Sequence, residues 1–249
     1  MIIAHLTCDA RSLSACTLTC YSWYLAAASH LHNTLVTRTN HWNRKLWWQD
    51  PLWRMHALGL LPLVKILWIR GDHQSTFSPT QLNPHTLRQF SALINVRNLL
   101  IDNLDIPSFM PNIQQYFGHF LPTVQVLALF KPRGSCRQII YFIGLFRHLE
   151  DLEFHDGVNL PPEPVDDSTL IPPHVPPLRG SLVVVCFGRA DLCLLRAMIK
   201  LFGGVRFRFV TLSDTRGTRL ILDACVETLE VLRLYPYNPR GGQPSQRDV

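Results

Sequence analysis

The sequence lacks a hydrophobic run long enough to cross a bilayer. Its two most apolar stretches, QIIYFIGLF and SLVVVCFG, fall well short of the roughly 20 residues that a membrane-spanning helix needs. The opening residues, MIIAHLTCDA, also lack the basic start and long apolar core of a secretory signal peptide. We therefore expect a cytoplasmic or nuclear protein, or one found in both compartments, that has no membrane partner.

Regular cysteine spacing is also missing. The 7 cysteines are odd in number and unevenly placed, which favours reduced thiols over a disulfide framework. Cys16 and Cys20 with His30 and His32 could be drawn as a zinc set, but histidines separated by one residue do not fit zinc-finger spacing. The two cysteines are also too far apart for a C-x-x-C redox motif. The sequence favours packing, and we predict neither a metal nor a cofactor.

Catalytic motifs are absent as well. There is no nucleophile elbow, no phosphate-binding glycine loop and no convincing pair of carboxylates. Glu150, Glu153 and His155 alternate along a predicted strand, where outward side chains are usually solvated or contact a partner. The net charge of +6 comes from scattered basic residues rather than the stripe that is typical of nucleic-acid binders. We expect neither an enzyme nor a nucleic-acid ligand.

What the sequence does contain is a repeat. An apolar-x-x-apolar-x-apolar pattern recurs, with copies between 22 residues (Phe207 to Leu229) and 33 residues (Leu149 to Leu182) apart. Its copies are Val64, Leu67, Ile69; Val96, Leu99, Ile101; Val124, Leu127, Leu129; Leu149, Leu152, Phe154; Leu182, Val185, Phe187; Phe207, Val210, Leu212; and Leu229, Leu232, Leu234. The last two apolar residues of each copy are two apart, so both point to one face of a strand.

Helical spacing fills two of the intervals between copies. The predicted apolar stripes are Ile139, Phe142, Ile143, Phe146 and Leu192, Leu195, Ile199, Phe202. Strand–helix units of this length are typical of leucine-rich repeats, in which each unit buries its apolar side against its neighbours. We predict an α/β fold built as an irregular leucine-rich-repeat-like solenoid, with an ordinary α/β domain as the alternative.

The amino-terminal segment has a helical pattern of its own. Asp9 or Ser12 can cap a helix there. Apolar residues then follow at spacings of three and four, which predicts a stripe along one helical face. The residues of this stripe are Leu13, Cys16, Cys20, Trp23 and Ala27.

The stretch LTCDARSLSACTLTCYSWYLAAASHLHNTLV resembles the second half of an F-box, with Leu13, Leu18, Cys20 and Trp23 at the positions of its leucines, cysteine and tryptophan. The Leu-Pro opening of that motif is absent, because the chain begins in the middle of the first F-box helix. With its irregular repeats, the chain resembles fungal F-box-like proteins that carry degenerate leucine-rich repeats.

The resemblance implies a function. An F-box docks on a Skp-type adaptor and so joins a cullin-based ubiquitin ligase, while the following repeats hold a protein substrate. The residues that would contact the adaptor or support that contact are Ile2, Ile3, Leu6, Leu13, Leu18, Cys20 and Trp23. The fold class is then α/β, with a short helical F-box-like N-terminus before the repeat region.

The predicted domains follow from these patterns. They are a partial F-box-like helical module (1–40), a tryptophan-rich linker (41–60), the repeat domain (61–235) with a proline-rich surface loop (161–177), and a disordered tail (236–249). The linker mixes tryptophans with basic residues, which can also stack on nucleic-acid bases. Packing between the two domains is the favoured interpretation.

We therefore predict a non-enzymatic adaptor that brings a protein target to a ligase. Outward residues along the predicted strands are the candidates for target binding: Lys65, Trp68, Arg70, Arg97, Asp102, Gln125, Glu150, Glu153, Arg206, Arg208, Glu230 and Arg233. Their mixed charge favours a protein partner over a polyanion. The alternative is a repeat scaffold that no longer binds the ligase adaptor and keeps Leu13, Cys20 and Trp23 as a structural cap.

Overall fold

The computed structural model describes residues 9–38, 50–71, 89–103, 105–109, 113–119, 121–155, 178–185, 189–201, 205–213 and 217–234. Several sequence predictions fall outside these residues. They are those for Ile2, Ile3, Leu6, Phe187, Phe202, the linker tryptophans Trp42, Trp47 and Trp48, the loop 161–177 and the tail 236–249.

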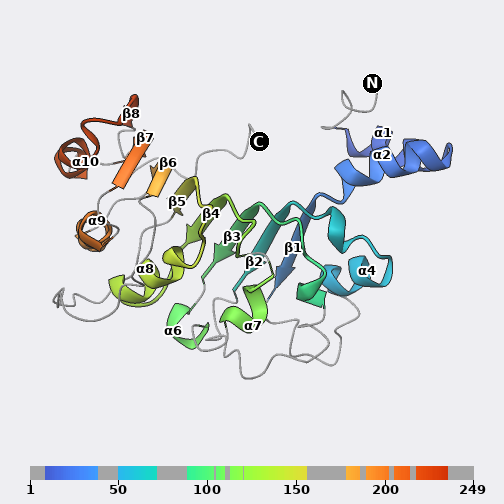
Figure 1. The fold of residues 1–249 in the computed structure, drawn as a ribbon. Helices are drawn as coiled ribbons and strands as arrows, with labels where there is room; N and C mark the ends of the chain where they lie inside the picture. Colours follow the sequence, from blue (N-terminus) through green and yellow to red (C-terminus); the bar gives the residue numbers. More distant parts are fainter. Residues whose placement is uncertain are drawn as a thin grey trace, which may run out of the picture.

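Eight parallel strands form one open sheet and follow one another across it in chain order (Figure 1). The strands are β1 (Thr34–Arg38), β2 (Ile66–Arg70), β3 (Asn98–Asp102), β4 (Val126–Phe130), β5 (Asp151–His155), β6 (Leu178–Val184), β7 (Val205–Leu212) and β8 (Val231–Leu234). Parallel neighbours need a crossover connection between them. The chain therefore has to return from the carboxyl end of each strand to the amino end of the next.

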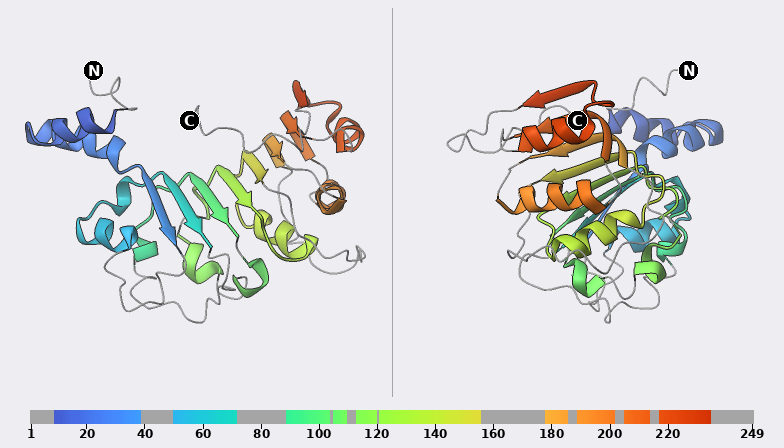
Figure 2. Two further views of the ribbon diagram at one scale, coloured as in Figure 1. Left: turned by 180° about the vertical axis from the view of Figure 1, so that it is seen from behind. Right: turned by 60° about the vertical axis from the view of Figure 1, so that its left-hand side comes forward.

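Helices cover one face of this sheet (Figure 2). They are α4 (Pro51–Ala57), η3 (Leu61–Leu63), α6 (Ile106–Phe109), α7 (Ile113–Phe117), α8 (Cys136–Gly144), α9 (Arg189–Leu201) and α10 (Thr218–Cys225). The main hydrophobic core lies between these helices and the sheet. The opposite face, called the open face below, is covered by no helix within the part of the chain that the structure describes.

The predicted repeat positions form buried rows across the sheet. Leu67, Leu99, Leu127 and Leu152 lie side by side on β2 to β5 and are buried. The second row is equally continuous, and it consists of Ile69, Ile101, Leu129 and Phe154. The copy Phe207, Val210, Leu212 is buried on β7, and that of β8 is more exposed because β8 ends the sheet. For these copies the strand prediction is confirmed.

One copy was assigned in the wrong register. The sequence prediction placed Val185 and Phe187 on the inner face of this strand, but Leu182 and Val184 are the buried pair of β6, and Val185 is only half-buried. Phe187, the third residue predicted for this copy, lies outside the described residues. A run of consecutive apolar residues in this strand has no alternation, so it cannot specify which residues face the core.

The helical stripe of α8 is confirmed. Ile139, Phe142, Ile143 and Phe146 are all buried. A capping box starts the helix: Gln138 N–H donates to Ser135 Oγ at 3.3 Å, and Ser135 N–H donates to Gln138 Oε1 at 2.8 Å.

The stripe predicted for α9 is only partly confirmed. Leu195 is buried, and Leu192 and Ile199 pack at the margin of the core. Leu194 and Met198, which the predicted stripe omitted, are buried more deeply than these two. The buried side of α9 is thus rotated relative to the prediction.

Strand β1 was not predicted, and it lies within the residues assigned to the N-terminal helical module. Leu35 occupies the inner row, but the next inner position is Thr37. The Thr37 hydroxyl donates to Asp50 Oδ1 at 3.1 Å and Oδ2 at 3.2 Å, and Asp50 Oδ1 also accepts from Leu52 N–H at 2.9 Å. A polar residue at an inner position interrupted the apolar pattern, and Asp50, which caps α4, satisfies it.

We expect Asp50→Ala to lower the free energy of unfolding by about 2 kcal/mol, because it removes the α4 cap and leaves the buried Thr37 hydroxyl without this acceptor. Denaturant unfolding followed by circular dichroism measures the change. Asp9→Ala is the matched control, because Asp9 caps α1 (Ala10–Thr17) in the same way but is exposed. An Asp50 variant no less stable than the Asp9 variant would contradict this account.

Helices α1 and α2 (Tyr21–Leu31) form a separate pair that projects beyond β1 (Figure 1). Leu13, Cys16 and Ala27 pack together as its own small core. The prediction of one continuous helical stripe is wrong, because the helix ends before Leu18 and a new one begins after Cys20. The Thr19 hydroxyl donates to the Cys16 carbonyl at 2.8 Å, which satisfies the end of α1. Cys20 therefore lies outside this core.

Candidate functional site

The α1–α2 pair begins at a well-formed cap. Asp9 Oδ1 accepts from the backbone N–H groups of Arg11 at 3.1 Å and Ser12 at 3.2 Å, while the Ser12 hydroxyl donates to Asp9 Oδ2 at 2.6 Å. These hydrogen bonds, above all the one from the Ser12 hydroxyl, hold the pKa of Asp9 below its ordinary value. Asp9 is thus the cap that the sequence offered, and Ser12 supports it.

The predicted adaptor-binding residues divide into two groups. Leu13 is buried between the two helices and serves their internal packing. Leu18 and Trp23 are exposed by 85% and 40%, and Cys20 is exposed between them in sequence. A hydrogen bond with Ser22 lowers the pKa of the Cys20 thiol.

Two further aromatic residues belong to the same exposed segment. Tyr21 and Tyr24 are exposed by 75% and 37%. Together with Leu18 and Trp23 they are exposed large apolar residues of the α1–α2 pair, and we call this set the helical apolar surface. The sequence analysis missed both tyrosines because it looked for one stripe, whereas the junction between two helices is what exposes them.

The open face of the sheet carries a second constellation, at the carboxyl ends of β2, β4 and β5. The Arg70 guanidinium lies over the Trp68 ring, 4.0 Å from its centroid. Trp68 stacks on Phe130 with ring centroids 6.0 Å apart, and Phe130 stacks on His155 at 4.5 Å. His155 Nε2 lies 2.9 Å from Glu153 Oε2. We call these five residues the aromatic cluster.

The structure thus brings together three predicted target-binding residues, Trp68, Arg70 and Glu153, with Phe130 and His155. Asp102 occupies the register position between Arg70 and Phe130. Phe130 was missed, although it is the last residue of β4 and one position beyond an inner residue. His155, at the same position of β5, was recognised on its predicted strand but was not among the target-binding candidates.

The remaining predicted residues lie elsewhere, mostly at the amino ends of the strands. Backbone hydrogen bonds connect this row: Arg97 N–H donates to the Lys65 carbonyl, Gln125 N–H to the Arg97 carbonyl and Glu150 N–H to the Gln125 carbonyl, each at 2.8 Å. Arg206 and Arg208 lie near the amino end of β7, and Glu230 immediately precedes β8. Arg233 lies on β8 itself.

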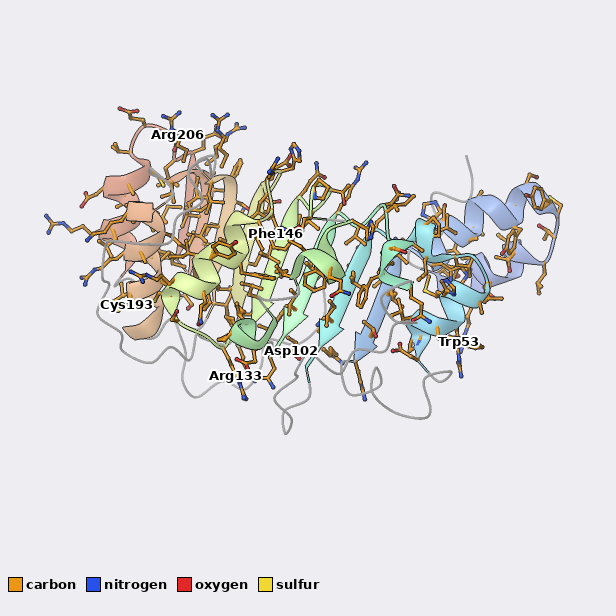
Figure 3. The ribbon with its side chains drawn as sticks, turned by 60° about the horizontal axis from the view of Figure 1, so that its bottom comes forward. Trp53, Asp102, Arg133, Phe146, Cys193 and Arg206 are labelled. Carbon is orange, nitrogen blue, oxygen red and sulfur yellow. The ribbon has the colours of Figure 1, made fainter. Side chains whose placement is uncertain are left out.

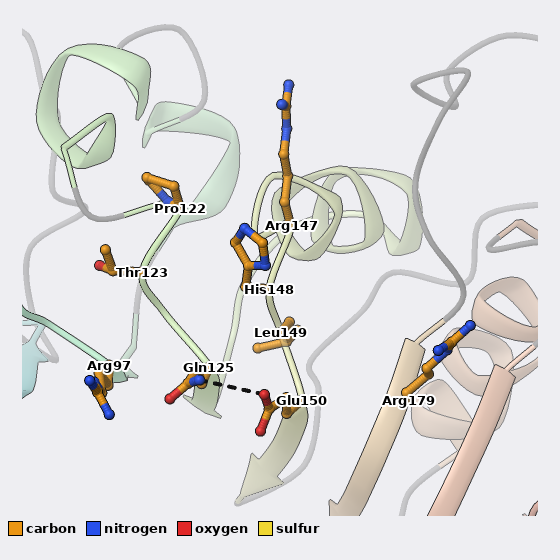
Figure 4. A pocket seen from close by; sticks show the side chains of 9 residues that line it. All are labelled: Arg97, Pro122, Thr123, Gln125, Arg147, His148, Leu149, Glu150 and Arg179. Atoms are coloured by element: carbon orange, nitrogen blue, oxygen red, sulfur yellow. Dashed lines mark hydrogen bonds between the residues drawn. The ribbon is translucent and has the colours of Figure 1, made fainter.

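A depression of about 640 Å³ opens in this row (Figure 4). Its polar lining comes mainly from side chains at the amino ends of four strands and from the turn before β5: Arg97, Thr123, Gln125, Arg147, His148, Glu150 and Arg179. Inside it, Gln125 Nε2 donates to Glu150 Oε1 at 3.4 Å. Sequence analysis missed Arg147, His148 and Arg179.

The twelve predicted target-binding residues therefore do not form one surface. One group belongs to the aromatic cluster or lies in register with it at the carboxyl ends of the strands. The other, from Lys65 to Glu230, lines the amino ends. Arg208 and Glu230 of this second group pair with each other, with Arg208 Nη2 2.6 Å from Glu230 Oε1.

Other kinds of site were also sought. Within the described ranges, no group of three or more histidine, cysteine or acidic residues is close enough to hold a metal ion. No helix among the same residues combines the length and the apolar character needed to span a membrane. Comparisons with models of known protein families, with curated proteins and with solved structures find no match.

Proposed function

We propose that this protein is a substrate-recruiting adaptor of a Skp/cullin/F-box-type ubiquitin ligase. The α1–α2 pair docks on the Skp-type adaptor, and the sheet binds a protein target. The mechanism is proximity rather than catalysis, because holding the ligase and target on one chain raises their effective concentration.

The helical apolar surface is the observation that carries this proposal. Leu18, Tyr21, Trp23 and Tyr24 are exposed on a helical pair whose core is separate from that of the sheet. Exposed large apolar side chains this close together in sequence are a feature of protein-binding segments. Leu18 and Trp23 are also the positions at which the sequence resembles an F-box.

In this proposal the part of the protein that binds the target is a leucine-rich-repeat-like solenoid, and the arrangement of the sheet supports it. Its strands follow one another in chain order and are all parallel, and the inner residues of consecutive copies lie in register. Each unit therefore buries its apolar side against the next, as repeat proteins do. No helix of the described part of the chain covers the open face, so a partner can reach it past these elements.

The alternative is a repeat scaffold in which the helical pair only caps the sheet. A cap needs to share its core with the unit that it covers. Leu13 and Cys16 instead pack with Ala27 in a separate cluster. This separation favours a docking role for the helical pair.

Binding of the purified chain to a Skp-type adaptor tests the proposal. We expect Leu18→Ala and Trp23→Ala each to weaken binding at least about tenfold, because both remove exposed contact area without touching the core. Isothermal titration calorimetry measures the affinity, and circular dichroism confirms that the variants remain folded.

Leu58→Ala is the matched control. Leu58 is exposed by 70%, but it follows α4 in the helical layer of the sheet rather than belonging to the α1–α2 pair. It should therefore bind like the unmodified chain. Failure of the unmodified chain to bind, or equal weakening in the Leu58 variant, would refute the adaptor role and leave the repeat scaffold.

A further inference from the structure

We propose that the amino ends of strands β2 to β7 form a binding site for an acidic segment of a protein partner. This inference specifies the target class within the proposed function. It starts from five cations that we call the basic edge: Lys65, Arg97, Arg147, Arg179 and Arg206.

The cations of the basic edge are exposed and unpaired within the described part of the chain. None of them makes a hydrogen bond or an ion pair through its side chain there. Arg208, their neighbour on β7, differs because Glu230 neutralises it. Arg208 is thus paired within the protein, whereas the five cations of the basic edge can contact solvent or a ligand.

The sheet places four of these cations in two neighbouring pairs. Arg179 and Arg206 are direct partners in the β6–β7 pairing. Lys65 and Arg97 immediately precede the adjacent strands β2 and β3, and the Arg97 N–H donates to the Lys65 carbonyl at 2.8 Å. Like charges held on neighbouring strands repel one another, and an anionic ligand relieves this repulsion. Figure 3 labels Arg206, which lies at the amino end of β7.

The depression lies between these two pairs. Arg97 and Arg179 line it from β3 and β6, with Arg147 and His148 on the turn above and Glu150 between them (Figure 4). Three strand spacings separate β3 from β6, which is about 14 Å. An extended peptide covers that distance in about four residues.

A specific ligand pattern follows from this geometry. Two acidic groups about four residues apart would reach the Lys65–Arg97 pair and the Arg179–Arg206 pair together. The residues between them should be neutral, because Glu150 repels a carboxylate at the centre. Clustered aromatic side chains that could stack on bases lie at the opposite ends of the strands, in the aromatic cluster. The basic edge therefore fits an acidic peptide better than a nucleic acid.

Fluorescence anisotropy with the labelled peptide Glu-Glu-Ser-Gly-Ser-Glu-Glu tests the inference on the full chain at low ionic strength. We expect saturable binding that falls as salt is added. Combining Arg97→Glu with Arg179→Glu should weaken it about tenfold. Glu150→Gln should instead tighten binding about threefold, a gain that misfolding cannot produce.

The control carries the same charge change elsewhere. Arg11 and Arg196 are exposed on α1 and α9, and neither belongs to the basic edge or lines the depression, so Arg11→Glu combined with Arg196→Glu should leave binding unchanged. A peptide with glutamine in place of each glutamate should not bind.

Three results would overturn the inference: no saturable binding, equal weakening in both double variants, or tighter binding of a short oligothymidylate than of the acidic peptide. None of these measurements involves the Skp-type adaptor. Loss of the acidic site is therefore distinguishable from failure of the proposed ligase role.

Discussion

Phe142→Ala is expected to lower the free energy of unfolding by about 3–5 kcal/mol, the range for removing a fully buried phenylalanine. Phe142 lies in the last turn of α8, has no exposed surface and meets the Phe146 ring edge to face at a centroid distance of 5.3 Å. The free energy of unfolding of a domain is typically about 5–15 kcal/mol, so this single change removes a large part of it.

Urea unfolding followed by circular dichroism measures the change, and Tyr141→Ala is its control. Tyr141 is the preceding residue on the same helix, but it is only partly buried and lies outside the core. Its loss should cost about 1 kcal/mol or less. Equal losses for the two variants would mean that α8 does not bury the side predicted for it.

The strand rows could be predicted from the sequence because their chemistry repeats. Leu67, Leu99 and Leu127 are each followed two residues later by another aliphatic residue, and only a strand puts both on one face. Parallel stacking then aligns the copies. Local spacing and long-range strand pairing agree here, and such agreement allows this part of the fold to be predicted from the sequence.

The elements that were missed share one physical cause, the absence of a local contrast between apolar and polar residues. In β1 the inner position after Leu35 is Thr37, which depends on Asp50 thirteen residues away. In β6 consecutive apolar residues carry no contrast, and Gly180 shifts the register. Both features become visible only when the tertiary contacts, with the start of α4 and with β7, are in place.

The candidate sites were predictable as residue types but not as surfaces. Trp68 and Glu153 were singled out as outward residues, yet their connection runs through Phe130 and His155, which come from two different strands. The sequence likewise separates Arg97 from Arg179 by most of three repeat units. The sheet register places the two on one depression.

Gly180→Ala is expected to destabilise the protein by about 3 kcal/mol or more, and it also affects the basic edge. Gly180 has a φ of +86°, which costs an L-residue about 1–2 kcal/mol. An added Cβ would in addition overlap the backbone carbonyl of Glu150, the group that accepts from Ser181 N–H. Backbone cannot move aside as a flexible side chain can, so the β5–β6 pairing must open.

Gly59→Ala separates the two contributions. Gly59 also has a positive φ, +67°, but an added Cβ there meets no atom within 4 Å. It should cost only the backbone strain of about 1–2 kcal/mol. The free energy of unfolding measured with denaturant should therefore be clearly lower for Gly180→Ala than for Gly59→Ala. Only the Gly180 variant should also lose affinity for the acidic peptide, because opening this pairing moves Arg179 away from Glu150 and Arg97. Equal stability of the two variants would show that position 180 of β6 tolerates a side chain and does not fix the geometry of the basic edge.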